Sequence, residues 1–329
     1  MGVFVFLPLV LPLTALPIAR LAEQHLHPRI ATRLLSALAC VLAVCSTLCL
    51  GLLVVVGTAQ LPGNPLPDGW SDPEVREAVP YDEIAGKAAM VALSAVAVGC
   101  ATAAGRHRRV RRRAHHALAG LPAGELAVLT DTAPYAYALP GPGPLPGPGP
   151  LPGPGVAAGA RGRIVVSTAM LACLGTQERK ALIAHEHAHL SGQHHRFLLA
   201  VRLAARANPL LRPLRSAVAY TTERWADEEA ARVTGERTVV ARAIGKAALV
   251  SRGTPAPTLA GFAAPVPGPV PRRVAALLGP APSAVSWPPV FTAVGLAAWT
   301  AAAGTLGSAL SSANATVTLL LVLKAATPL

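Results

Sequence analysis

The sequence predicts a mainly α-helical membrane protein, with about four transmembrane helices and one small α+β domain outside the bilayer. Three observations support this class. Several long stretches carry no charged residue, and arginines gather in the segments between some of them. One segment mixes short β-branched runs with helical patterns. The apolar fraction of 52%, the charged fraction of 14% and the mean hydropathy of +0.47 are not typical of a soluble protein.

Four apolar runs are long enough to cross a bilayer, which takes about 20 residues in a helix. We expect spans at approximately 2–19, 34–57 and 88–105, and a final span that begins at 290. The first run has no positive residue before its apolar core, and Arg20 follows that core. This polarity is the reverse of a signal peptide, so a retained helix is expected. For residues 311–329 an outer tail, an amphipathic helix on the membrane and a short return into it remain alternatives.

The distribution of arginine predicts the orientation. The first loop contains Arg20, Arg29 and Arg33, the second loop is mainly acidic, and the third span is followed by RHRRVRRR. Basic loops stay in the cytoplasm, so we expect an outer N-terminus and a cytoplasmic segment after the third span. The basic segments then lie against the anionic headgroups of the lipid bilayer. No direct nucleic-acid binding is expected, because no aromatic residues interrupt the arginine cluster.

The cytoplasmic domain is expected at 106–252. Short β-branched runs predict strands at 125–131, 134–141 and 163–168. A proline–glycine repeat at 140–155 separates the last two. Proline lacks a donor for a strand ladder, so we expect this repeat to be an enlarged hairpin loop without a catalytic role.

Helical patterns follow the strands. The expected helices run from an N-cap at Thr176 through a histidine cluster, over 197–207, from Thr221 or Thr222 to Gly235, over 236–249, and over 271–278. The expected organisation has four parts. Residues 1–105 form three spans with a short cytoplasmic loop and an acidic outer loop, and residues 106–252 form the cytoplasmic domain. A proline-rich linker follows at 253–289, and a final span with a short tail at 290–329.

The histidine cluster, HEHAHLSGQHH at 185–195, carries the chemistry. His185 and His189 are four residues apart and project from one face of a helix. Glu186 lies beside them and can reach a water at a metal without being a ligand. This spacing is typical of zinc proteases, in which the glutamate is the general base. His187 points away from that face, and we expect it to make a surface or packing contact.

Two candidates exist for a third ligand. In the metzincin pattern it is His195, with the helix ending at Gly192 and a methionine turn further along. All three methionines precede the motif, however, and the residues after Gly192 look helical. In the other interpretation Glu223, from a later helix, completes the site, while Asp227 accepts a hydrogen bond from a ligand histidine. The sequence favours Glu223. An oxyanion stabiliser is also expected, and three residues remain candidates for it: Tyr220, Arg224 and His194.

The order of YALPG, RIVVSTAML, ALIAHEHAHL and a later ExxAD helix, framed by apolar spans, resembles the integral-membrane metallopeptidases of the BlaR/MecR type. The resemblance implies a gluzincin domain at the cytoplasmic membrane surface, with His185, His189 and Glu223 as zinc ligands and Glu186 as the base. Membrane proteases of the CAAX-prenyl and heat-shock type share these motifs. The β-lactam sensors of the BlaR/MecR type carry an outer penicillin-binding domain with a Ser-x-x-Lys nucleophile. No Ser-x-x-Lys occurs here, so a short form without that sensor domain is expected.

These observations predict a membrane-embedded zinc endopeptidase that cleaves a cytoplasmic protein. The resemblance suggests a transcriptional repressor as its substrate and a role in regulatory signalling. Two alternatives remain: a protease for membrane-protein quality control of the heat-shock or CAAX type, and a zinc-stabilised membrane signal transducer without turnover. The sequence does not predict the activating signal or the oligomeric state.

Overall fold

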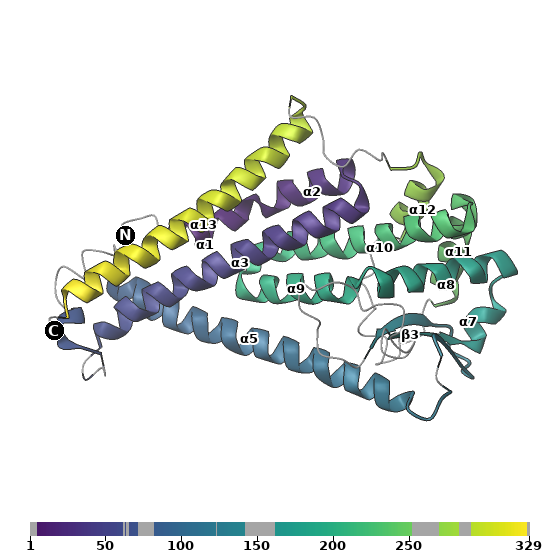
Figure 1. Cartoon of the computed structure of the whole chain (residues 1–329), viewed down its shortest axis with the longest axis horizontal. Helices are drawn as coiled ribbons and strands as arrows, with labels where there is room; N and C mark the ends of the chain where they lie inside the picture. Colours follow the sequence, from purple (N-terminus) through teal and green to yellow (C-terminus); the bar gives the residue numbers. More distant parts are fainter. Residues whose placement is uncertain are drawn as a thin grey trace.

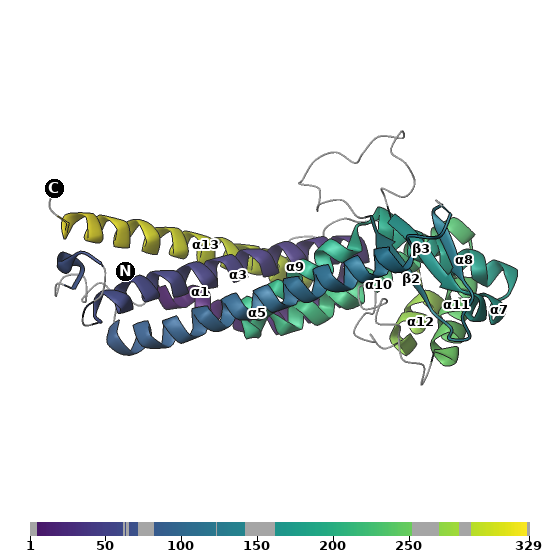
Figure 2. The same ribbon diagram turned by 90° about the horizontal axis from the view of Figure 1, so that it is seen from below.

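The computed structural model describes residues 5–61, 63, 66–71, 82–122, 124–141, 162–251, 270–282 and 291–327. Long helices form a bundle at one end of the molecule, and a small sheet with several shorter helices lies at the other end (Figures 1 and 2). Most of the predicted proline–glycine loop at 140–155 and most of the predicted linker at 253–289 fall outside the described residues.

Within the described part of the chain, three helices are long and apolar enough to cross a membrane. The candidate spans are Pro28–Ala59, which is helix α3, Ile84–Ala117 within α5 (Asp82–Ala117), and Ala293–Ala325, which is α13. They are consistent with a membrane protein, while the orientation stays a prediction. Helix α13 continues unbroken past residue 310, so the segment 311–325 extends this helix.

The predicted span at 2–19 is not a single helix. Its described part consists of α1 (Leu7–Val10), the 3-10 turn η2 (Leu11–Thr14) and the first half of α2 (Ala15–His25). Pro8 and Pro12 lack the N–H that would continue a preceding helix, and each lies in the first turn of a new element, which explains the interruption. These elements contact α3 and α13. The fourth span therefore stays a prediction.

Helices α3 and α5 cross very closely near one end of the bundle. A Cβ atom on Gly57 would collide with the backbone of Gly86, and the reverse also holds. Only glycine at both positions allows this approach. From there α5 extends beyond the apolar part of the bundle, and its arginine-rich end leads into the sheet (Figure 2).

The sheet has the strands β1 (Leu126–Leu129), β2 (Ala136–Pro140) and β3 (Gly162–Ser167) in the order β1-β3-β2. Strand β3 is parallel to β1 and antiparallel to β2, as expected if β2 and β3 form a hairpin. Tyr137, Leu139 and Val165 pack against Ala114 in the last turn of α5 and Leu118 just after it. Among the described residues, β2 has a strand partner on one side only.

Among the described residues, seven helical elements lie between the sheet and α13 along the chain. They are α7 (Thr168–Ala172), α8 (Thr176–Ser191), α9 (His194–Ala207), the 3-10 turn η4 (Pro209–Leu211), α10 (Arg212–Thr234), α11 (Arg237–Val250) and α12 (Val270–Leu278).

Three helix boundaries differ from the sequence prediction. The N-cap position of α8 is Gly175, whose N–H donates to the carboxylate of Glu178, and Thr176 is already helical. Helix α10 begins at Arg212, well before the expected start near Thr221. The residues after Gly192 are helical as expected, in α9 from His194, but they do not continue α8: α8 ends at Ser191, and Gln193 has a left-handed backbone with φ of 51°.

Helices α9 and α10 form a hairpin that lies along α3 (Figure 1). At its turn the amide of Asn208 donates to the hydroxyl of Ser46 at 3.1 Å and to the Leu9 carbonyl at 3.3 Å. Leu211 and Leu214 share a hydrophobic core with the apolar part of α3. The hairpin therefore connects the sheet end of the molecule with the helix bundle.

Candidate metal centre

Three potential ligand atoms converge between α8 and α10. The Nε2 atoms of His185 and His189 are 3.1 Å apart, and each lies 3.4 Å from an oxygen of Glu223. The three atoms all lie within 4.8 Å of one another. Two imidazoles and one carboxylate are the donor set of His₂Glu zinc sites. The residues that the sequence proposed as ligands are therefore neighbours in space.

Asp227 orients the first of these imidazoles. Its Oδ1 atom lies 3.1 Å from Nδ1 of His185, on the side of the ring opposite the cluster, and Asp227 has no exposed surface. Glu223 and Asp227 are one helical turn apart on α10, so both face α8. A carboxylate behind a ligand histidine fixes the tautomer and the direction of the ring.

His194 occupies the corresponding place behind His189. The Nδ1 atoms of the two rings are 2.9 Å apart, and the ring of His194 packs against Trp225 with centroids 4.4 Å apart. Burial and then the neighbouring His189 lower the pKa of His194 to about 2, so it is neutral and can accept from His189. His194 is completely buried, which removes it as an oxyanion stabiliser that contacts a substrate. Sequence reasoning missed this supporting position.

Gly192 and His195, the two residues that suggested a metzincin, have other environments in the structure. A side chain on Gly192 would collide with the imidazole of His194, so this glycine makes room for that ring. His195 is absent from the group of three converging residues. Its pKa falls to about 3 through burial and then through Arg111 and Arg196, which places it among cations. The structure therefore groups Glu223, and not His195, with the histidine pair.

Arg273, on α12, is the residue that sequence reasoning missed entirely. Its guanidinium donates to both oxygens of Asp227 at 2.8 and 2.6 Å and lies 2.9 Å from Oε2 of Glu223. It is buried, and one cation thereby holds two buried carboxylates. The sequence offered one weak signal, two arginines within the short helix predicted at 271–278, but nothing separated Arg273 from Arg272.

The charges of the cluster follow from burial and pairing. Burial opposes ionisation of Glu223, but Arg273 and then His189 hold the pKa of its carboxyl well below the usual range. Asp227 has a lowered pKa for a similar reason. Burial would lower the pKa of His185, but Asp227 and Glu223 raise it to about 10. Burial lowers the pKa of His189 to about 4. In the metal-free site, two carboxylates therefore face a protonated His185 and Arg273.

Glu186 lies beside the cluster with free hydrogen-bonding capacity. It is buried, and its Oε2 atom has no partner among the described residues. Burial raises its pKa to about 7, and its carboxyl makes a backbone hydrogen bond with Ala138 of β2. A carboxyl group whose pKa lies near neutrality can both accept and return a proton.

The remaining residues discussed from the sequence have partners outside the converging group. Arg224 pairs with Glu228 at 2.5 Å, and the ring of Tyr220 lies 4.0 Å from the guanidinium of Arg272. His187 is exposed, with Nε2 3.2 Å from Glu125, so it makes the expected surface contact.

One comparison with known proteins gives a match. Residues 154–211 match the model of Peptidase family M48. The match supports a zinc metallopeptidase family. Its described part extends from β3 to η4, so it contains His185, Glu186 and His189 but ends before Glu223. It leaves the resemblance to the BlaR/MecR type a prediction. No curated protein and no solved structure matches the chain.

Proposed function

We propose that the protein is a membrane-embedded zinc endopeptidase that cleaves a cytoplasmic protein. One observation carries the proposal: the convergence of His185, His189 and Glu223 within 4.8 Å, with the buried carboxyl of Glu186 beside them. The match to Peptidase family M48 and the three helices that could cross a membrane support the same conclusion.

The residues of the cluster fit zinc. Two imidazole nitrogens and one carboxylate oxygen favour zinc over magnesium or calcium, which prefer oxygen ligands. The second nitrogen of each histidine already faces a partner, Asp227 or His194, so both Nε2 atoms point at one position. Zinc bound there supplies Lewis-acid polarisation of the scissile carbonyl and acidifies water.

Each protein group then has a defined task. Glu186 takes a proton from the attacking water and returns it to the leaving amine, for which a pKa near 7 is well suited. Asp227 and His194 hold the ligand imidazoles in position, and Arg273 holds the carboxylate of Glu223.

Strand β2 provides a place for the substrate. One of its edges has no strand partner among the described residues, and its Ala138 contacts Glu186. An extended peptide that pairs with this edge would pass the general base, with its main chain held by ladder hydrogen bonds. The predicted proline–glycine loop leaves from the end of this strand, at Pro140.

The substitution Glu186→Gln tests the proposal. We expect the purified variant to retain zinc but to lose proteolysis by about 10²-fold or more, since the general base is removed. Glu236→Gln is the matched control, because Glu236 is an exposed carboxylate beyond the end of α10. If Glu186→Gln cleaves as fast as the control, the proposed catalytic role is wrong.

The same variant distinguishes the kind of substrate. A single cytoplasmic protein that accumulates intact in cells with Glu186→Gln would support the regulatory role, with a transcriptional repressor as the expected class. Accumulation of many damaged membrane proteins would instead support quality control. A phenotype that Glu186→Gln leaves unchanged would favour a signal transducer without turnover.

A further inference from the structure

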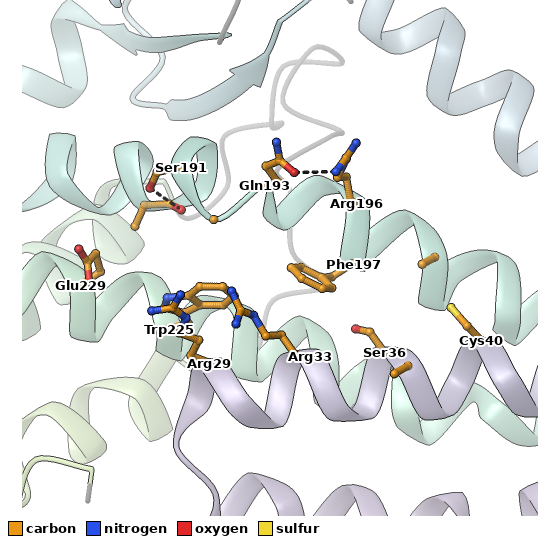
Figure 3. A pocket seen from close by; sticks show the side chains of 14 residues that line it. Arg29, Arg33, Ser36, Cys40, Ser191, Gln193, Arg196, Phe197, Trp225 and Glu229 are labelled. Carbon is orange, nitrogen blue, oxygen red and sulfur yellow. Dashed lines mark hydrogen bonds between the residues drawn. The ribbon is translucent and has the colours of Figure 1, made fainter. Parts of the chain in front are cut away.

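A cavity of about 680 Å³ lies behind the candidate metal centre, between the first turns of α3, the end of α8, the start of α9 and the middle of α10 (Figure 3). Three arginines line it: Arg29 and Arg33 from α3, and Arg196 from α9. Glu229 is its one acidic lining residue. We call this the arginine cavity. The metal centre does not use it.

The two arginines that α3 contributes to the arginine cavity lie against an aromatic ring. The guanidinium carbons of Arg29 and Arg33 lie 5.4 and 5.5 Å from the ring centroid of Trp225, and neither arginine forms an ion pair within the described part of the chain (Figure 3). Glu229 pairs with Arg232 at 2.5 Å. Adjacent guanidinium groups repel one another, and an anion between them relieves this repulsion through charge-assisted hydrogen bonds.

The position of the cavity points to the source of that anion. Arg29 and Arg33 immediately precede the apolar stretch of α3, the depth at which lipid headgroups lie when such a helix crosses a bilayer. Ala37 lines the arginine cavity and also a second, almost wholly apolar cavity of about 430 Å³. The second cavity lies between α2, α3 and α13, with Leu21, Leu38 and Leu306 among its lining residues.

We propose that the arginine cavity binds the phosphate headgroup of an anionic phospholipid, with an acyl chain in the adjoining apolar cavity. Arg29 and Arg33 supply planar, fixed donors that match phosphate oxygens. Because Ala37 lines both cavities, an amphiphilic molecule that extends past Ala37 along α3 would reach both of them, which a soluble phosphate cannot do. Trp225, against which both arginines lie, also packs on His194, so the headgroup would sit next to the residues that support His189.

Lipid binding to the purified full-length protein tests the proposal. In a zwitterionic detergent, native mass spectrometry would measure the dissociation constants for phosphatidylglycerol and phosphatidylcholine, and competition by inorganic phosphate or glycerol 3-phosphate. We expect the phosphatidylglycerol dissociation constant to rise at least about tenfold in Arg29→Gln/Arg33→Gln, because charge-assisted hydrogen bonds are lost. Arg108→Gln/Arg109→Gln removes the same charge from exposed positions on α5 and should leave the constant within about twofold of wild type.

A second variant covers the case in which the arginine variant fails to fold. Ala37→Phe adds a ring at the wall between the two cavities without a change of charge. It should weaken binding of phosphatidylglycerol at least about tenfold, since the acyl chain loses its place, and leave binding of glycerol 3-phosphate unchanged.

Three results would overturn the proposal. One is unaltered phosphatidylglycerol binding by folded Arg29→Gln/Arg33→Gln or by Ala37→Phe. Another is displacement of the lipid by equimolar inorganic phosphate, which would identify a site for a soluble anion. The last is displacement by a peptide with a free C-terminal carboxylate but not by its amide, which would identify a peptide subsite. None of these measurements depends on proteolysis, so the proposed function is tested separately.

Discussion

The substitution Asp227→Asn tests how the protein supports its candidate metal ligands. Asp227 accepts three contacts: Oδ2 receives Nε of Arg273, while Oδ1 receives Nη2 of Arg273 and faces Nδ1 of His185. Asparagine has nearly the same shape but offers only one oxygen. Whichever way its amide is turned, its NH₂ group points at a donor of Arg273, and in one orientation at His185 as well.

The magnitude follows from the complete burial of this position. Asp227 has no exposed surface, so water cannot replace the lost acceptor. Loss of a hydrogen-bond partner behind a ligand histidine typically lowers metal affinity about 10- to 100-fold, which is about 1.4 to 2.7 kcal/mol. We expect the zinc dissociation constant of Asp227→Asn to rise by this factor.

Competition with a zinc chelator, on the purified protein at fixed pH, would measure this change. Glu229→Gln is the matched control, since it removes one carboxylate from the same helix, and Glu229 pairs with Arg232 away from the cluster. The control should bind zinc as wild type does. If Asp227→Asn also binds zinc with wild-type affinity while remaining folded, Asp227 does not orient His185.

Three further predictions concern the same cluster. Glu223→Ala should lose stoichiometric zinc in elemental analysis while His195→Ala keeps it, and the opposite pattern would make His195 the ligand. Arg273→Met should lower the temperature of thermal denaturation of the metal-free protein, since an unpaired buried charge costs about 3–5 kcal/mol. Arg272→Met, which removes a half-exposed arginine, should change that temperature little. Equal effects of the two substitutions would contradict the pairing of Arg273 with the buried carboxylates. Because the pKa of His185 is raised to about 10, zinc binding at pH 7 should release at least one proton, and zinc affinity should increase with rising pH below 10. Calorimetry in buffers of different ionisation enthalpy would count the released protons. A count of zero would refute His185 as a ligand that is protonated in the metal-free protein.

Local helical periodicity made the central part of the site predictable. The spacing of His185 and His189, and of Glu223 and Asp227, places each pair on one face of its helix, and the structure has both pairs on continuous helices. The spacing alone could not show that these two faces meet. The choice between Glu223 and His195 therefore depended on arguments against a metzincin and on a family resemblance.

Backbone features with weak sequence signals account for the errors. The helix break after Gly192 depends on a left-handed Gln193, and glutamine has no marked preference for that conformation. The break turns His194 toward His189 and His195 away from it, so two adjacent histidines have unrelated environments. In the N-terminal run, Pro8 and Pro12 lie at the starts of two short helical elements, so the described residues do not form one continuous helix, and the span expected at 2–19 stays a prediction.

Arg273 lies on α12, so only the tertiary structure could show that it contacts Glu223 and Asp227 of α10. In the metal-free cluster, two cations, Arg273 and protonated His185, balance the carboxylates of Glu223 and Asp227, so the candidate ligands can remain buried and ordered without a metal. If zinc bound as proposed, it would displace the proton of His185 and add two positive charges, and the cluster would carry an excess of one positive charge. The carboxyl of Glu186, whose pKa is about 7, could then ionise and supply a negative charge. Metal binding would in that case also favour the basic form of the residue proposed to accept a proton.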